Sequence, residues 1–139
     1  MRAIGLDYGS KTMGVALSDE TKLIASPIET IRYNSFDELF SKLDIYFDKY
    51  KIDTVVLGNP KNLDGSLSDR SALSLEMKDM LFNRYHIDVI MEDERYTSVI
   101  ANNMLISNGE RRKDRKSVVD KLAASIILQS YLDRSNNGR

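Results

Sequence analysis

The chain lacks cysteine altogether and contains a single histidine, His86. Without cysteine, disulfide bonds and zinc sites built from thiolates are excluded. One histidine cannot form a multi-histidine metal site and argues against a Ser–His hydrolase, so we interpret His86 as a solvated residue between a helix and a strand. Any divalent ion must therefore be held mainly by carboxylates, which favours Mg²⁺ or Mn²⁺.

Long apolar runs are missing too. No stretch is long enough to span a membrane. The N-terminus also lacks the basic region, apolar run and cleavage site that are typical of a signal peptide. We therefore expect a cytoplasmic protein without a membrane partner.

A global excess of positive charge is the third absence. The net charge is −1, whereas many nucleic-acid-binding proteins are strongly basic, so binding would need a local patch. The chain has one dense basic run, which contains Arg111, Arg112, Lys113, Arg115 and Lys116. Its functional interpretation is contact with a nucleic-acid backbone, and its alternative is a solvated loop.

The length of 139 residues suits one domain. We place this domain at residues 1–133 and expect a disordered tail at 134–139. Apolar runs bounded by turn residues predict strands at residues 3–7, 13–17, 23–31, 54–58 and 88–91. Three strands followed by alternating helices and strands predict an α/β fold, with helices packed on a mixed sheet.

Polar residues at helix starts indicate where the helices begin. Ser35 and Glu38 have the spacing of a capping box, Ser66 is a candidate cap for the second helix, and Thr97 or Ser98 for the third. The third helix should end near Asn108, and the last should run from about Ser117 to Leu132. The second helix is expected to pack through a stripe of Leu73, Met77, Met80 and Leu81.

Asp7 ends the first expected strand and stands before a turn that contains Gly9. A buried carboxylate at this position is costly unless it is paired or binds a metal. Gly5, Gly9 and Gly14 remove side chains around it, which would let a phosphate or another backbone approach. The segment therefore suggests a site for a metal ion and a phosphate, and the alternative is an ordinary β-hairpin.

Two further carboxylates are candidates for the same site. Glu94 follows the strand at 88–91, and ligands gather at the carboxyl ends of parallel strands. The alternative is a solvated acidic turn in which Asp93 competes for the role. Asp120 shares a helix face with Ala123, Ala124, Ile127 and Tyr131, although Ser117 and Asp120 also fit a capping box.

Three converging carboxylates repel one another at neutral pH, and divalent cations relieve this repulsion. Such ions also supply positive charge where a phosphodiester transition state builds negative charge. Two ions roughly 4 Å apart can activate a water and stabilise the leaving oxygen. This chemistry requires neither histidine nor cysteine.

Four groups of residues occur in order along the chain. They are Gly5-Leu6-Asp7-Tyr8-Gly9 with Gly14-Val15-Ala16 and Ser18-Asp19; Gly58-Asn59-Pro60 with Asp64-Gly65-Ser66; Asp93-Glu94-Arg95 with Thr97-Ser98; and Asp120, Ala123-Ala124 and Ile127-Leu128-Gln129-Ser130-Tyr131-Leu132. Each group is weak alone, but four at this spacing are highly specific. From about Ile4 to Leu132 the chain resembles the bacterial YqgF (RuvX) family of small nucleases with the ribonuclease H-like fold.

The resemblance implies a five-stranded mixed sheet flanked by helices. It implies a metal-dependent nuclease in which Asp7, Glu94 and Asp120 form the acidic site. The family is associated with maturation of the 5′ end of precursor 16S ribosomal RNA, and by analogy of fold it has been described as a Holliday-junction resolvase. We rank RNA processing first, since analogy of fold is weak evidence for junction cleavage.

The turn after the first strand departs from the family, which usually has an arginine where Thr12 stands. If that arginine contacts phosphate, Lys11 would have to replace it as a point charge without the bidentate fork. Arg95 adjoins Glu94 and is a candidate for the scissile phosphate or for an ion pair within the site.

Two other classes of protein remain as rivals. The segment Asp7-Tyr8-Gly9-Ser10-Lys11 resembles the first phosphate loop of actin-like ATPases, but those proteins need two such domains and a second glycine-rich loop. A non-catalytic module that binds RNA or a pre-ribosomal particle is the other rival. A monomer and a homodimer both fit the sequence, and a dimer would suit a two-fold symmetric junction.

Overall fold

The computed structural model describes residues 1–60, 64, 68–94, 97–107 and 112–137. Five strands form one sheet in the order β3-β2-β1-β4-β5. The strands are β1 (Arg2–Tyr8), β2 (Thr12–Ser18), β3 (Ala25–Arg32), β4 (Ile52–Asn59) and β5 (Val89–Asp93). β1, β2 and β3 pair in antiparallel fashion, whereas β4 and β5 add in parallel. This is the mixed five-stranded sheet that was predicted.

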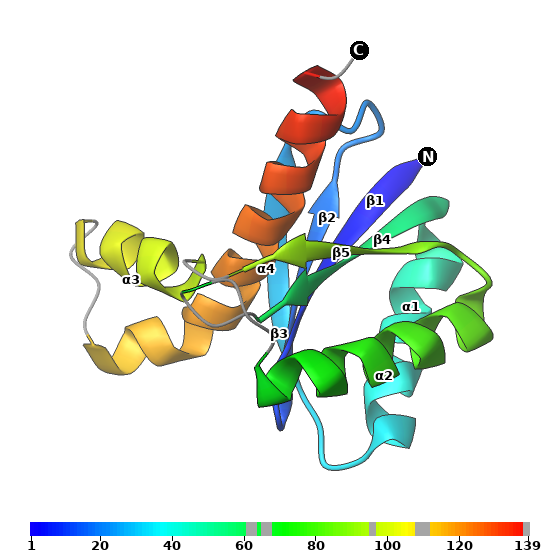
Figure 1. The fold of residues 1–139 in the computed structure, drawn as a ribbon, viewed down its shortest axis with the longest axis horizontal. Helices are drawn as coiled ribbons and strands as arrows, with labels where there is room; N and C mark the ends of the chain where they lie inside the picture. The colour runs from blue at the N-terminus through cyan, green and yellow to red at the C-terminus, as the bar shows by residue number, and fades with distance from the viewer. Residues whose placement is uncertain (61–63, 65–67, 95–96, 108–111, 138–139) are drawn as a thin grey trace.

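The helices in the described residues are α1 (Phe36–Lys49), α2 (Asp69–Tyr85), α3 (Thr97–Ser107) and α4 (Arg112–Asn137), of which α1, α2 and α4 pack on the sheet. Leu39 of α1 and Leu81 of α2 pack on one face in a large apolar core, and Leu128 of α4 packs on the opposite face. α3 packs against α4; α3 and the first turns of α4 lie to one side of the sheet at the left of the view, and the rest of α4 crosses the sheet (Figure 1). None of the helices, in the part of the chain that the structure describes, is long and apolar enough to cross a membrane.

Two glycines let α4 approach the sheet closely. A Cβ atom at Gly14 would lie 1.9 Å from the backbone oxygen of Asp120, and one at Gly5 would lie 2.6 Å from Cβ of Leu128. Side chains at these two positions are therefore sterically excluded. Of the two roles suggested for these glycines, the close approach of another backbone is the one that the structure shows.

The helix starts confirm one expectation and correct another. Ser35 caps α1 by accepting a hydrogen bond from the backbone N–H of Glu38. α2 begins at Asp69, and Ser68 rather than Ser66 is its cap. The hydroxyl of Ser68 accepts from the backbone N–H of Ser71, whose own hydroxyl accepts from the Ser68 N–H. Ser66 lies outside the described residues.

The buried face of α2 also differs from the expected stripe. Leu73 is 43% exposed, whereas Ser71 and Ser74 are buried together with Met77 and Leu81. Met80 also packs against the core, so the expected stripe is wrong only at Leu73, and the buried serines take the place that this leucine was expected to fill.

α4 is longer than predicted at both ends. It begins at Arg112 rather than near Ser117, so the basic residues from Arg112 onward start a helix instead of forming a loop. Ser117 therefore lies inside the helix, which excludes the capping-box interpretation of Asp120. At the other end the expected disordered tail is wrong for residues 134–137, because they continue α4 and Arg134 forms an ion pair with Glu92. Residues 138–139 are outside the described part.

Candidate functional site

Asp7 lies near the end of β1 on the face that α4 covers. Its neighbours Leu6 and Tyr8 point to the opposite face and join the larger core, as the alternation of side chains along a strand requires. In the pairing of β1 with β2, Asp7 stands opposite Gly14. The half-buried carboxyl group is thus held between the sheet and the Asp120 turn of α4.

Glu94 reaches Asp7 across β4, the strand that separates β5 from β1. It follows β5, and its side chain shares a hydrogen bond with the carboxyl group of Asp7. Its backbone is fixed at two points, because its N–H donates to Asn59 O at 3.2 Å and its carbonyl accepts from the Thr97 N–H at 3.0 Å. The sequence left the choice between Asp93 and Glu94 open, and the structure shows that Glu94 contacts Asp7.

β4 lies between these two carboxyl groups, and Gly58 makes their contact possible. A Cβ atom at Gly58 would lie 2.1 Å from Oε2 of Glu94 and 2.7 Å from Cδ1 of Ile127. Any larger residue would fill the space that Glu94 crosses. Gly58 was noted in the sequence only as part of a motif, and its contact with Glu94 is a property of the fold.

Burial changes the acidity of this pair. Loss of solvation raises the pKa of Asp7, and the nearby charge of Asp120 raises it further. Loss of solvation and the charge of Asp7 raise the pKa of Glu94 to about 9. The two carboxyl groups therefore hold one proton between them near neutral pH, as close carboxyl pairs do.

Asp120 stands near this pair without joining it. It is half-buried on α4, on the same side as the buried Ala123, Ala124 and Ile127, as the helix stripe predicted. Its charge acts on Asp7, but within the described residues no group of three acidic, histidine or cysteine side chains is spaced to hold an ion. The structure thus brings two of the three predicted carboxylates into contact and places the third close by.

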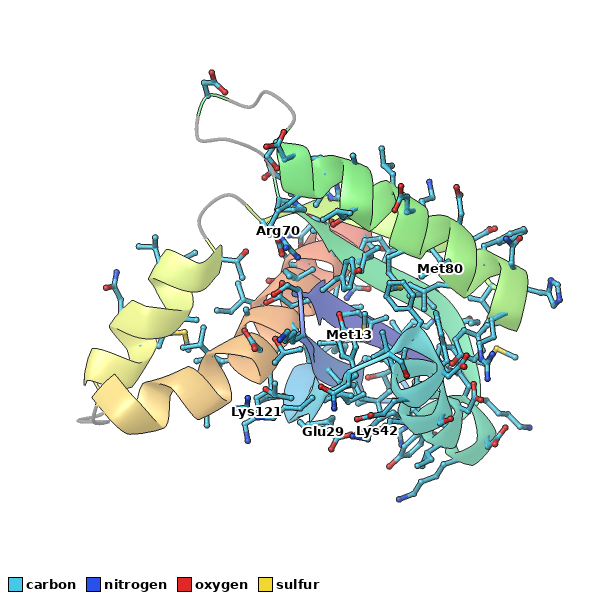
Figure 2. The ribbon with its side chains drawn as sticks, turned by 90° about the horizontal axis from the view of Figure 1, so that it is seen from below. Met13, Glu29, Lys42, Arg70, Met80 and Lys121 are labelled. Atoms are coloured by element: carbon cyan, nitrogen blue, oxygen red, sulfur yellow. The ribbon has the colours of Figure 1, made fainter. Side chains whose placement is uncertain are left out.

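Arg70 is a member of the site that the sequence did not reveal. It lies in the first turn of α2 and points toward the end of β1 (Figure 2). Its Nη2 donates to the carbonyl of Tyr8 at 2.8 Å, and its guanidinium carbon lies 5.8 Å from the centre of the Tyr8 ring. Its positive charge lowers the pKa of both Asp7 and Glu94. Sequence periodicity does not predict this contact, because it depends on how the start of α2 is placed relative to the end of β1.

The other predicted nucleic-acid contacts are less completely described. Lys11 is exposed in the turn after β1, at the same end of the sheet as Asp7. Arg95 and Arg111 lie outside the described residues. The backbone of the remaining basic residues belongs to the start of α4, and their side chains are outside the description; they are Arg112, Lys113, Arg115 and Lys116.

Comparison with known proteins decides the family. The family model described as "RuvX: Holliday junction resolvase" matches residues 1–134. The chain belongs to the RuvX family. Two relatives, each named "Putative pre-16S rRNA nuclease", agree over nearly their whole lengths. The protein of Agathobacter rectalis is 42% identical over 100% of this chain and 99% of its own length, and that of Bacillus subtilis is 45% identical over 98% and 100%.

Solved structures confirm the predicted ribonuclease H-like fold. RuvC of T. thermophilus in complex with a Holliday junction substrate aligns with a TM-score of 0.57 at 12% identity, over 97% of this chain and 96% of that chain. The Fowlpox virus resolvase in complex with Holliday junction DNA also aligns at 0.57, with 16% identity over 97% and 99%. The RuvX-family chain therefore has the fold of these resolvases, and the four sequence motifs identified its family correctly.

Proposed function

We propose that this chain is a divalent-metal-dependent nuclease that hydrolyses phosphodiester bonds, most directly in processing the 5′ end of precursor 16S ribosomal RNA. The observation that carries the proposal is the contact between Asp7 and Glu94, with Arg70 beside it at the end of β1. Carboxylate oxygens are ligands for hard divalent cations, and a guanidinium binds phosphate oxygens. Groups that can hold a metal ion and a group that can bind the phosphate therefore lie together at the end of β1, as a phosphodiesterase requires.

The groups present fit Mg²⁺ or Mn²⁺. Asp7 and Glu94 offer only oxygen ligands, and Gly58 lets the Glu94 side chain cross β4 to reach Asp7. Asp120, whose charge already acts on Asp7, is the third ligand in this proposal. When bound, a pair of such ions would supply positive charge to the transition state and lower the pKa of a bound water.

The protein's own groups prepare this site. Asp7 and Glu94 share a proton, which they must release before both carboxylates can act as ligands. Arg70 favours this release because its charge lowers the pKa of both groups. Its attachment to the carbonyl of Tyr8 fixes the guanidinium at the end of β1, where its planar shape suits bidentate contact with a phosphate.

Two substrates are supported by separate observations. The relatives at 42% and 45% identity are named for precursor 16S ribosomal RNA, and this is the substrate we rank first. The family description and the junction-bound neighbours name Holliday junctions instead, so a structure-specific DNA endonuclease is the second candidate. At 12% and 16% identity these neighbours support the fold rather than the substrate.

The test is cleavage of labelled precursor 16S RNA and of a four-way DNA junction, side by side, with Mg²⁺, Mn²⁺ or a chelator. Three variants are compared with the wild type: Asp7→Asn, Asp120→Asn and, as a matched control, Asp48→Asn on the exposed side of α1. We expect metal-dependent RNA cleavage that both site variants lose by about a hundredfold or more. The control should cleave at the wild-type rate with an unchanged circular dichroism spectrum.

Other outcomes select other functions. Symmetric nicking of the junction without RNA cleavage would promote the resolvase. Tight RNA binding without any cleavage would favour the non-catalytic module, unless addition of the pre-ribosomal particle restores cleavage. Full activity in a clean preparation of the Asp7→Asn variant would refute the role given to Asp7.

A further inference from the structure

A groove between the edge strand β3 and helix α1 has no assigned role. Its volume is about 520 Å³. Figure 2 shows Glu29 of β3 and Lys42 of α1 together at this rim, apart from Arg70. The residues that matter for its chemistry are Glu29, Arg32, Lys42, Ile45, Tyr46 and Lys49.

The groove combines positive charge with apolar surface. Three cationic side chains line it against the single carboxylate of Glu29, which already accepts a hydrogen bond from the hydroxyl of Tyr46. One of these cations, Lys42, also forms an ion pair with Glu38 at 3.3 Å. Ile45, which lines the groove between these lysines, is 61% exposed. Proteins that bind single-stranded nucleic acid combine cations for the phosphates with aromatic rings for the bases, and Tyr46 and Tyr50 supply rings in this lining.

The groove begins at the same end of the sheet as the acidic pair. Arg32 stands opposite Thr12 in the pairing of β3 with β2. The next residue, Tyr33, fixes the turn after β1: its N–H donates to Lys11 O at 3.1 Å and its hydroxyl donates to Gly9 O at 2.6 Å. The turn that follows Asp7 and the mouth of the groove are therefore held together.

The register of the sheet gives the distance between Asp7 and the groove. Asp7 stands opposite Gly14, and Gly14 stands opposite Thr30, which lines the groove. Adjacent strands are about 4.8 Å apart, so two steps place the backbone of Thr30 about 10 Å from that of Asp7. From there α1 extends the groove by about 10 Å more between Lys42 and Lys49. α1 packs on the opposite face of the sheet from Asp7 and α4, so a bound strand passes from one face to the other around the end of the sheet, beside the turn after β1.

A protein strand is a poor alternative occupant of this edge. The carbonyl of Arg32 already accepts a hydrogen bond from Nζ of Lys42 at 2.8 Å. Pro27 has no N–H to offer, and the register of β3 shifts between the partners of Val15 and Ala16. Proline and irregular register are devices that prevent pairing at sheet edges.

We propose that the groove between β3 and α1 binds the single-stranded part of a nucleic-acid substrate that continues beyond the bond cleaved at Asp7. This inference rests on the proposed nuclease function. Lys42 and Lys49 contact the phosphates of the strand, while Ile45 and Tyr46 contact its bases. The groove therefore favours substrates in which a single-stranded extension adjoins the cleavage point.

The experiment uses two RNAs, a stem that contains the cleavage point and the same stem with a single-stranded extension. Binding is measured by fluorescence anisotropy with the Asp7→Asn protein at several salt concentrations, and cleavage is measured with otherwise wild-type protein. The groove variants are Lys49→Gln, Lys42→Gln with Lys49→Gln, and Ile45→Glu. Lys78→Gln on α2, which does not line the groove, is the control.

We expect the extended RNA to bind more tightly than the stem, and the groove variants to abolish this advantage. The double variant should lower the salt slope by about 1.4, since each phosphate contact on a single strand contributes about 0.7. Stem binding and stem cleavage should stay unchanged. Ile45→Glu keeps the inference testable if loss of Lys42 disturbs β3, because Ile45 is exposed.

Two results separate this inference from the proposed function. If the wild type cleaves RNA but the extension adds no affinity, or the variants retain it, the groove inference is overturned and the nuclease stands. If groove-dependent binding is found without cleavage of any substrate, the groove stands and the nuclease proposal fails. Selective binding of an extended peptide at this edge, with no effect of the variants on RNA, would also overturn the inference.

Discussion

Glu94 shares a hydrogen bond with Asp7 across the strand that separates them, and it does so by passing over Gly58. The two carboxyl groups are 87 positions apart in the chain. Their contact requires the parallel addition of β4 and β5 to β1, and it requires that β4 present no side chain at this point. Four predictions follow from this arrangement and from the charges around it.

Replacement of Gly58 by alanine should disable the site more than it disturbs the fold. The new Cβ would stand 2.1 Å from Oε2 of Glu94, so this side chain must move away from Asp7. Overpacking of this size costs about 1–3 kcal/mol of unfolding free energy. We expect cleavage to fall about a hundredfold or more with a cooperative thermal transition retained; wild-type cleavage in this variant would show that the Glu94 position is unimportant.

The stability of the metal-free protein should fall as the pH rises toward 9. In the unfolded chain the carboxyl groups of Asp7 and Glu94 have ordinary pKa values of 3.8 and 4.5, whereas in the folded protein both are raised, that of Glu94 to about 9. The folded state therefore binds more protons over this interval. Its stabilisation is complete below the unfolded pKa and is lost as the pH rises through the folded pKa.

Urea unfolding in chelator at pH 6 and pH 8.5 measures this effect. The Asp7→Asn variant should show a weaker dependence, because Glu94 then loses the neighbouring charge that raises its pKa. Mg²⁺ should stabilise the wild type more at pH 8.5 than at pH 6, since its ligands must be deprotonated. If the unfolding free energy of the wild type instead rises from pH 6 to pH 8.5, Asp7 and Glu94 do not share a proton in the folded protein.

Loss of Arg70 should lower the rate of cleavage and shift its pH profile. We expect Arg70→Ala to reduce kcat about a hundredfold and to move the profile toward higher pH, since the charge that lowers the pKa of Asp7 and Glu94 is gone. Arg70→Lys should restore the pH profile more fully than kcat, because lysine keeps the positive charge but lacks the planar guanidinium group that can bind a phosphate through two hydrogen bonds. Arg84→Ala, in the same helix but paired with Asp44, is the matched control.

Neutralisation of Arg111 and Arg112 should weaken binding without changing the substrate preference. Glutamine at Arg111 and Arg112 removes two charges that we assign to phosphate contact. The salt slope of binding to single-stranded RNA should then decrease by about 1.4, as measured by anisotropy with Asp7→Asn protein. An unchanged slope would show that these two charges do not contact phosphate and are merely solvated.

The sequence predicted the elements whose signal is local. The β-branched run Thr54-Val55-Val56 reads as a buried strand and forms one, and Ser35 caps α1 as its spacing with Glu38 indicated. Such patterns show which side chains face the core and which face solvent, and in these segments the spacing of apolar and polar residues along the chain is enough to show it. Local signals failed where small polar residues are buried, as at Ser71 and Ser74 in α2, and where α4 continues beyond its apolar stripe.

For this protein, the sequence by itself determined the family, the α/β class and the position of Asp7 at the end of the first strand. The tertiary structure decided the partners of Asp7. It selected Glu94 over Asp93, brought Arg70 to the carbonyl of Tyr8, and joined the groove at Arg32 to the turn after β1. These contacts depend on strand order and on the return of distant helices to the sheet, and side-chain periodicity carries no information about either.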